Sequence, residues 1–373
     1  MIPIAHSLMG LGLSVGERAR NAAALLASRP LRHKADMLVE AHPIADIEEG
    51  TARSAAAPAV SVLIPVRNCA PYLDEMFESL AAQSFADFEI IVVDNGSCDG
   101  TRDILQAWAK REPRLRAFHL ARPGLARSLN FAASKARAPL LARIDGDDVA
   151  EPHRLAVQVS AMRARPSLGL LGSGAELIDS RGRHIGTLDR PLTDSKLRAF
   201  LRNGCAFVHS SVIMRREIFL AAGGYRKGLN VAEDYDLWLR IAEQSEIANL
   251  PDRLVRYRVH TASATARKPV RQAIAIACTR AASEARRIGR PEPFFRGIPE
   301  LRKALPLLGM TERAFRRSLR LTAFRLYVSH QYLALPLPTR FKAVLRSTAI
   351  RLGLRPLYVL GLRSILAAAR MRA

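Results

Sequence analysis

The stretch Ala138-Pro139-Leu140-Leu141-Ala142-Arg143-Ile144-Asp145-Gly146-Asp147-Asp148 joins a short apolar run directly to three carboxylates. The run predicts a buried strand, and the acids begin where that strand would end, at the edge where open α/β sheets bind ligands. Because like charges so close together repel, the cluster predicts a cation. Oxygen ligands of this kind favour Mg²⁺ or Mn²⁺, which completes its shell with water and substrate phosphates. The alternative is a solvated acidic turn before a helix near Pro152.

Two earlier segments predict the surrounding sheet. Val60–Val66 is typical of a central strand, and apolar residues spaced by three and four predict a helix from Tyr72 to about Gln83. Phe88–Val93 predicts a second buried strand, which another helix follows. Strands that alternate with helices at this pitch indicate a parallel sheet.

The second of these strands would end in Asp94-Asn95-Gly96-Ser97-Cys98-Asp99-Gly100-Thr101. Its glycines permit tight turns, and its polar side chains can meet a ligand at the carboxyl edge of the strand. For Asp99 and Thr101 we favour a structural role, as caps of the helix that begins at Arg102.

Five segments of the chain, in this order and at this spacing, resemble the family 2 glycosyltransferases. They are Val60–Asn68, Val92–Ser97, Gly124–Asn130, Ile144–Asp148 and, as a fifth piece, Gly223–Tyr225 with Ala232–Arg240. The resemblance runs from about Val60 to about Thr265. It implies an inverting, nucleotide-sugar-dependent enzyme with the α/β GT-A fold, a Rossmann-like mixed sheet flanked by helices. A basic helical extension would follow at the C-terminus.

The resemblance also implies a donor site that contains a divalent cation. The residues expected to hold the nucleobase and ribose are Pro65, Arg67, Asp94 and Asn95. Asp147 would coordinate Mg²⁺ or Mn²⁺ through the diphosphate of the donor, and Asp145 would contact the ribose or a metal-bound water. Asn95 stands where the family often has a second Asp. Since an amide both donates and accepts, the base of the nucleotide stays open.

Asp234 matches the catalytic base of the family. Sugar transfer from a nucleotide diphosphate needs one base for the acceptor hydroxyl, a cation for the leaving group, and both partners held in line. One protein carboxylate therefore handles protons, whereas glycosidases need a pair. The alternative is that Asp234 or Glu233 is only an N-cap or first-turn acid of the following helix.

Further candidate residues are expected near the cation site and near the catalytic base. Tyr257-Arg258-Val259-His260 follows an expected strand, and the resemblance places Arg258 or His260 near the diphosphate. By its chemistry a neutral imidazole can be a third metal ligand, and a guanidinium can pair with phosphate. His260 could equally be a surface residue. On the acceptor side we expect Glu233, His209 and Trp238.

The net charge of +23 is unevenly distributed along the 373 residues. Residues 290–373 contain 17 Lys and Arg against 3 Glu, which gives +14, and no acid follows Glu312. We expect an N-terminal extension and linker over 1–57, partly disordered or helical, a GT-A domain over 58–289, and a basic amphipathic helical tail over 290–373. Four cysteines far apart, without zinc-type spacing, predict reduced thiols.

Basic residues interleaved with apolar ones in this tail favour an anionic membrane surface as a partner. A solvated basic helix packed on the catalytic domain is the alternative. Nucleic acid is not expected, because no recognition motif accompanies the charge. No apolar stretch reaches the roughly 20 residues that span a bilayer, and the beginning lacks a basic signal. The sequence thus predicts a cytoplasmic enzyme, peripheral at the inner face of the membrane.

The preferred function is metal-assisted transfer of one sugar to a polysaccharide or lipid-linked acceptor in bacterial surface glycan synthesis. The alternative is a non-catalytic nucleotide-binding or membrane-associated scaffold with the same fold. Retention of Asp145, Asp147 and Asp234 argues against it. A sugar nucleotidyltransferase would need a glycine-rich loop after its first strand, and Pro65-Val66-Arg67-Asn68-Cys69 has no glycine.

Overall fold

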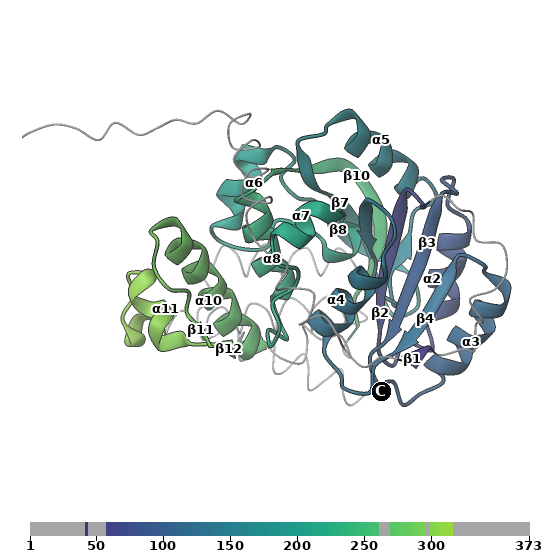
Figure 1. Ribbon diagram of the computed structural model, residues 1–373, viewed down its shortest axis with the longest axis horizontal. Coiled ribbons are helices and arrows are strands. Elements are labelled where there is room, and N and C mark those ends of the chain that lie inside the picture. Colours follow the sequence, from purple (N-terminus) through teal and green to yellow (C-terminus); the bar gives the residue numbers. More distant parts are fainter. Residues whose placement is uncertain (1–41, 44–56, 261–268, 296–297, 316–373) are drawn as a thin grey trace, which may run out of the picture.

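The computed structural model describes residues 42–43, 57–260, 269–295 and 298–315, and a mixed sheet forms its centre (Figure 1). The strands of the sheet lie in the order β1-β4-β3-β2-β5-β9-β7-β10-β6, and β8 pairs with β7. These strands are β1 (His42–Pro43), β2 (Val60–Val66), β3 (Phe88–Asp94), β4 (Leu115–His119), β5 (Leu140–Arg143), β6 (Val149–Ala150), β7 (Leu168–Ile178), β8 (His184–Leu188), β9 (Ile213–Arg215) and β10 (Glu246–Arg258). The helices that accompany the sheet are α2 (Leu73–Ala81), α3 (Thr101–Arg111), α4 (Leu125–Lys135), α5 (Arg154–Ala164), α6 (Asp194–Leu201), the 3-10 turn η2 (His209–Ser211), α7 (Arg216–Ala221) and α8 (Glu233–Ala242).

The sheet is parallel in one half and mixed in the other. Strands β4, β3, β2 and β5 run parallel, so their carboxyl ends meet at one edge. Strand β9 then pairs antiparallel with both β5 and β7, and β10 runs parallel to β7. The mixed α/β sheet flanked by helices confirms the expected fold class, and the parallel half matches the alternating strand and helix pattern.

Each face of the sheet carries its own hydrophobic core. In β3, Ile90 and Val92 belong to the core under α2, α3 and α5, whereas Ile91 and Val93 belong to the core under α4 and α8. Strand residues alternate between faces, so a continuous apolar run is what a strand covered on both sides requires. Figure 1 shows α4 and the pair α2 and α3 on opposite sides of these strands.

Beyond the sheet, a C-terminal helical unit packs beside α8 (Figure 1). It contains α10 (Pro269–Arg287), the hairpin β11 (Phe294–Phe295) and β12 (Ile298–Pro299), and α11 (Leu301–Leu307). Cys278 and Ala281 of α10 share a small core with Ala304 of α11. The boundary expected at residue 290 therefore runs between two helices that pack together. Most of 1–57, and the interleaved tail from residue 316 onward, lie outside the described residues.

Candidate active site

Three carboxylates converge immediately after β5. Asp145, Asp147 and Asp148 each offer an oxygen within 4.8 Å of the others. The backbone N–H of Asp148 donates to the carbonyl oxygen of Asp145 at 3.2 Å and closes the turn. At Gly146 a Cβ would lie 2.6 Å from Cγ1 of Val66, so this turn packs against the end of β2 only because the residue is glycine. The structure thus brings the predicted cation ligands together at the predicted edge.

Arg143 supplies a buried countercharge to this cluster. Its Nη1 donates to Oδ2 of Asp145 at 2.7 Å and to Oγ of Ser210 at 2.9 Å, and its Nη2 also bonds Asp145. Burial raises the pKa of Asp145, and the Arg143 guanidinium counteracts that rise. Arg143 is therefore both the last residue of the strand and the ion-pair partner of the first acid.

The other two acids differ in their surroundings. Asp148 is buried: its Oδ1 accepts from the backbone N–H of Arg258 at 2.7 Å, and its Oδ2 accepts from the hydroxyl of Ser210. Burial, followed by repulsion from Asp147 and Asp145, raises the pKa of Asp148. The side chain of Asp147 is 22% exposed, and its Oδ2 lies 2.8 Å from Nε2 of His260. The side chain of Asp145 is 30% exposed, but Arg143 engages both of its oxygens. Asp147 is thus the acid of the three that neither Arg143 nor Ser210 engages, and Asp148 holds the turn in place.

Arg258 lies beneath the turn rather than beside it. It is the last residue of β10, whereas the sequence placed it after the strand. Its Nε donates to the carbonyl oxygen of Asp147 at 2.7 Å, and its two other nitrogens donate to Asp179 and Glu75. The side chain is only 2% exposed and lies 4.8 Å from the ring of Tyr72. With every guanidinium nitrogen engaged, Arg258 holds the backbone of the acidic turn in this structure.

The expected nucleotide segment forms a hydrogen-bonded edge at the ends of β2 and β3. Asp94 is buried and accepts from Ser97, Arg102 and His119, each at 2.9 Å. Burial works to raise its pKa, but these hydrogen bonds outweigh burial and hold the pKa of Asp94 below its usual value. The Oδ1 of Asn95 accepts from the backbone N–H of Gly124 at 2.6 Å and fixes the start of α4.

The two loops on this edge are tied to each other. Asn68, in the left-handed region at φ +53°, donates its backbone N–H to Ser97 and accepts from that of Cys98, both at 2.9 Å. Asp99 and Thr101 bond the backbone of the neighbouring loop, at Ala70 and Cys69. Asp99 also accepts from the backbone N–H of Thr101 at 3.0 Å, but Gly100 is the N-cap of α3 and Thr101 is its first residue, so Thr101 does not cap a helix that begins at Arg102. The other two residues expected to hold the nucleobase and ribose, Pro65 and Arg67, lie on the same edge. Pro65 is buried within β2, opposite Val93, and Arg67 is exposed at the end of that strand.

Glu233 and Asp234 form the first turn of α8. The helix follows Ala232, which is left-handed at φ +56°, and no side chain caps it. Asp234 accepts from the backbone N–H of Tyr235 at 2.7 Å and from the Cys205 thiol at 3.5 Å, and burial raises its pKa. Burial, with the adjacent Asp234 carboxylate, raises the pKa of the buried Glu233 to about 8. The Arg143 guanidinium counteracts both rises in pKa.

His209 and Trp238 form an aromatic layer under this turn. The Nε2 of His209 lies 2.8 Å from the hydroxyl of Tyr225, and its ring meets that of Trp238 edge-on at 5.7 Å. Burial, with the nearby Arg143 charge, lowers the pKa of His209 well below its usual value, so the ring is neutral. Trp238, expected on the acceptor side, is fully buried and lies in the core under the turn.

Sequence reasoning gave no role to Arg143 and Cys205, and it placed Ser210 and Tyr225 on the acceptor side without predicting the contacts that they make. A signal existed for the first, because an arginine within an apolar strand that ends in acids needs a partner. No comparable signal marks Ser210, which only the fold brings to Asp145 and Asp148.

Comparisons with known proteins identify the family of this chain. The model of the family described as glycosyl transferase family 2 matches residues 61–221. The O-antigen biosynthesis glycosyltransferase WbnJ of Escherichia coli is 32% identical over 208 residues, which cover 55% of this chain and 81% of WbnJ. The amylovoran biosynthesis glycosyltransferase AmsE of Erwinia amylovora is 32% identical over 50% of this chain and 70% of its own length.

Among solved structures, residues 1–349 of S. aureus TarS in complex with UDP-GlcNAc superpose with a TM-score of 0.52 at 20% identity, over 74% of this chain and 78% of that one. The protein is a glycosyltransferase that belongs to glycosyl transferase family 2, and its fold is the GT-A fold. This confirms the family resemblance. Within the described ranges, no helix has the length and apolar character needed to cross a bilayer.

Proposed function

We propose that this glycosyltransferase moves one sugar from a nucleotide-diphosphate donor to an acceptor hydroxyl, with inversion of the anomeric centre and with a divalent cation. One observation carries the proposal: the turn η2 links the acidic turn that bears Asp147 to the helix that bears Asp234. Its Ser210 bonds Asp145 and Asp148, and the ring of the adjacent His209 meets Trp238 of α8 at 5.7 Å. A cation site and a base on opposite sides of one reacting centre are what an in-line displacement requires.

The residues present fit Mg²⁺ or Mn²⁺. Three carboxylates and the Arg143 guanidinium leave two net negative charges when all are ionised, which one divalent cation balances. Asp147 would be the direct protein ligand, with Asp145 and His260 beside it, and oxygen ligands of this kind suit either ion. When bound, the cation would supply neutralisation of the diphosphate that leaves.

Asp234 would take the proton of the acceptor hydroxyl. Its pKa is raised by burial, so its carboxylate is a stronger base than that of an exposed aspartate. Glu233, with a pKa of about 8, is mostly protonated at neutral pH and is a neutral hydrogen-bonding neighbour. The pair thus divides into one ionised group that accepts a proton and one neutral group that orients its surroundings.

Donor recognition would involve the edge formed by β2 and β3. Pro65, Arg67, Asp94 and Asn95 lie at or near the carboxyl ends of these strands, where open α/β sheets bind ligands. Hydrogen bonds of Asp94 to Ser97 and Arg102, and of Asn95 to Gly124, fix the shape of this edge. Arg258 would act indirectly, by fixing the backbone under Asp147.

The acceptor would be a polysaccharide or a lipid-linked glycan of a bacterial surface. The names of WbnJ and AmsE, which refer to O-antigen and amylovoran biosynthesis, support this class. The basic C-terminal residues support attachment to the inner face of an anionic membrane, since Lys and Arg near such a surface each contribute about 1 kcal/mol.

A screen of nucleotide sugars tests the function. Each donor is incubated with the protein and Mn²⁺ or EDTA, and hydrolysis, transfer to glycan acceptors and the anomeric configuration of the product are measured. We expect one donor class to be used, only with the cation, with inversion. Retention of configuration, or equal turnover in EDTA, would contradict the mechanism. Cation-dependent binding without turnover of any donor would favour the scaffold.

A further inference from the structure

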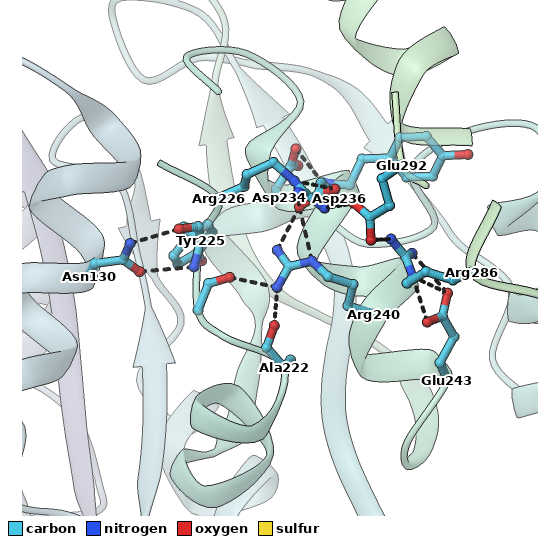
Figure 2. Close-up of polar contacts among 12 residues, drawn as sticks. Asn130, Ala222, Tyr225, Arg226, Asp234, Asp236, Arg240, Glu243, Arg286 and Glu292 are labelled. Carbon is cyan, nitrogen blue, oxygen red and sulfur yellow. Dashed lines mark hydrogen bonds and ion pairs between the residues drawn. The ribbon is translucent and has the colours of Figure 1, made fainter. Parts of the chain in front are cut away.

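A second cluster of charges lies at the first turn of the helix that bears the proposed base (Figure 2). At its centre is Asp236, whose side chain is fully buried. Arg226 approaches both of its oxygens, with Nε at 3.2 and 3.3 Å. Arg240 donates to Oδ2 from Nη2 at 2.6 Å and from Nε at 3.0 Å. One buried carboxylate thus holds two arginines.

Arg240 extends this cluster to the loop before α8. Its Nη1 donates to the carbonyl oxygen of Gly224 at 2.8 Å and also to that of Ala222. The same loop is tied to α4, because Asn130 accepts from the backbone N–H of Tyr225 at 2.9 Å and donates to its carbonyl oxygen at 2.7 Å (Figure 2). The loop and the helix are therefore held as one body.

The geometry of α8 relates the contacts of Asp236 to the direction of the Asp234 side chain. Successive residues of an α-helix are rotated by about 100°, so side chains two positions apart point to nearly opposite sides. When Asp236 is held inside the protein, Asp234 must face the site and the Cys205 thiol. The turn starts from Ala232 at φ +56°, a conformation that only its surroundings can maintain in a residue other than glycine. The position of Asp234 thus depends on the contacts of Asp236.

The outer partners of Arg226 come from the C-terminal helical unit. Its Nη2 lies 2.5 Å from Oε2 of Glu292, and its guanidinium stacks on the ring of Phe294 at 4.3 Å. Oε1 of Glu292 accepts in turn from Arg286 of α10 at 2.9 Å, and Arg286 also pairs with Glu243 just after α8 (Figure 2). Arg226 is therefore shared between the helix that carries the proposed base and the unit that follows the catalytic sheet.

We propose that Asp236, Arg226, Arg240 and Glu292 form a clamp through which the C-terminal helical unit positions Asp234. These are positioning residues, because they act on the base through the turn of α8. The proposal rests on the proposed function insofar as Asp234 is the base. The coupling itself concerns only the structure of the turn, so it can be tested without a known donor.

The first test uses Cys205 as a reporter on the full-length protein. Its thiol bonds Asp234, and burial, with the Asp234 charge, raises the pKa of Cys205 well above its usual value, so it should react slowly. Alkylation by iodoacetamide is followed by peptide mapping, with exposed Cys98 and buried Cys278 as internal references. Glu292→Gln should accelerate alkylation of Cys205 about tenfold, which corresponds to ~1.4 kcal/mol of local opening. Both references should keep their rates.

The matched control is Glu243→Gln. It breaks another tie between α8 and α10 but touches neither Asp236 nor Arg226, so Cys205 should keep its wild-type rate. Phe294→Leu and the conservative Glu292→Asp serve as further variants, and Glu292→Asp should restore much of the protection. Unchanged Cys205 reactivity in Glu292→Gln, or an equal increase in Glu243→Gln, would overturn the clamp.

The second test is kinetic and uses whichever nucleotide sugar the donor screen identifies. Glu292→Gln should lower kcat about tenfold or more, as small misplacements of catalytic groups do, and leave the KM for the donor unchanged. A parallel loss of donor affinity would contradict a role confined to the base. If the wild-type protein uses no donor, the proposed function fails while the Cys205 experiment still decides the clamp.

Discussion

The Nε2 atom of His260 lies 2.8 Å from Oδ2 of Asp147, although 113 positions separate the two residues. The pairing of two strands explains this contact. Strand β6, which follows the acidic turn, runs antiparallel to β10, with Val149 opposite Arg256 and Ala150 opposite Val255. This register places the residue at the end of β10 beside the turn that precedes β6. A two-residue strand thereby aligns the proposed cation ligands.

Asp147→Ala should abolish cation-dependent donor binding, because it removes the acid of the cluster that neither Arg143 nor Ser210 engages. Asp145 and Asp148 remain, but their oxygens are engaged by Arg143, Ser210 and the backbone of Arg258. Calorimetry with candidate nucleotides, with Mn²⁺ and with EDTA, measures the effect. His260→Ala should weaken binding about 10–100-fold, as the loss of a supporting partner does.

The control for this experiment is Asp252→Asn, which removes an exposed acid from β10 without affecting the turn. It should bind donor as the wild type does. Donor affinity that is the same in EDTA and in Mn²⁺ would refute the assignment of the cation site.

Asp234→Asn should lower the rate of transfer about 10²–10⁴-fold and leave donor affinity nearly unchanged, because the carboxylate acts on the acceptor proton. Asparagine keeps the size and can still accept from the backbone of Tyr235, so folding should survive. Glu233→Gln should do less, since glutamine resembles the protonated form that a pKa of about 8 favours at neutral pH. Turnover and donor titrations of both variants provide the measurement.

Near-normal transfer by Asp234→Asn would eliminate it as the base. If Glu233→Gln were inactive in the same assay, Glu233 would be the catalytic base instead.

Glu233 should make stability depend on pH. Its pKa is about 8 in the folded protein against 4.5 for an ordinary glutamate, so the folded state retains a proton that the unfolded state loses between these values. The wild type therefore loses stability as pH rises from 4.5 to about 8. Glu233→Gln lacks this loss and should be the more stable protein by at least about 1 kcal/mol at about pH 8.5.

Urea unfolding of both proteins at about pH 5 and about pH 8.5 measures this difference. A gap between the two proteins that stays constant over this range would show that Glu233 does not titrate there.

Removal of residues 316–373 should release the protein from anionic vesicles and leave donor binding intact. This segment holds 12 Lys and Arg and no Asp or Glu. The cut belongs after Phe315 rather than near Glu300, because Leu305 and Phe315 share a core with α10. Co-sedimentation at low and high salt is the assay, and salt should weaken attachment of the full chain because it screens the charges. Equal co-sedimentation of both proteins would contradict the prediction.

Much of the fold was predictable because periodicity reports burial. The strands Val60–Val66 and Phe88–Asp94 and the helix Leu73–Ala81 occur almost where the patterns place them. The cluster of acids after β5 was predictable for the same reason. Charged residues that directly follow an apolar run mark the end of a buried strand. The family resemblance added Asp234 and the order of the motifs.

The rest depends on pairings that no local pattern records. The direction of the Arg258 guanidinium is set by Glu75 and Asp179, which lie far away in the sequence. Asp236 gave no signal either, because an acid in a first helical turn is ordinary and its two arginine partners are defined only by the packed loop. Trp238 lies on the buried face of α8. The sequence alone could not distinguish a side chain buried beneath the site from one that lines the site.

The buried guanidinium of Arg143 has a consequence for the energetics of ligand capture. Without a positive group, three neighbouring carboxylates would spread apart whenever no cation was present, and each binding event would have to draw them together again. Arg143 holds Asp145 and Ser210 permanently in register. The site is therefore preorganised, and little conformational entropy would be lost on binding of the proposed cation and diphosphate.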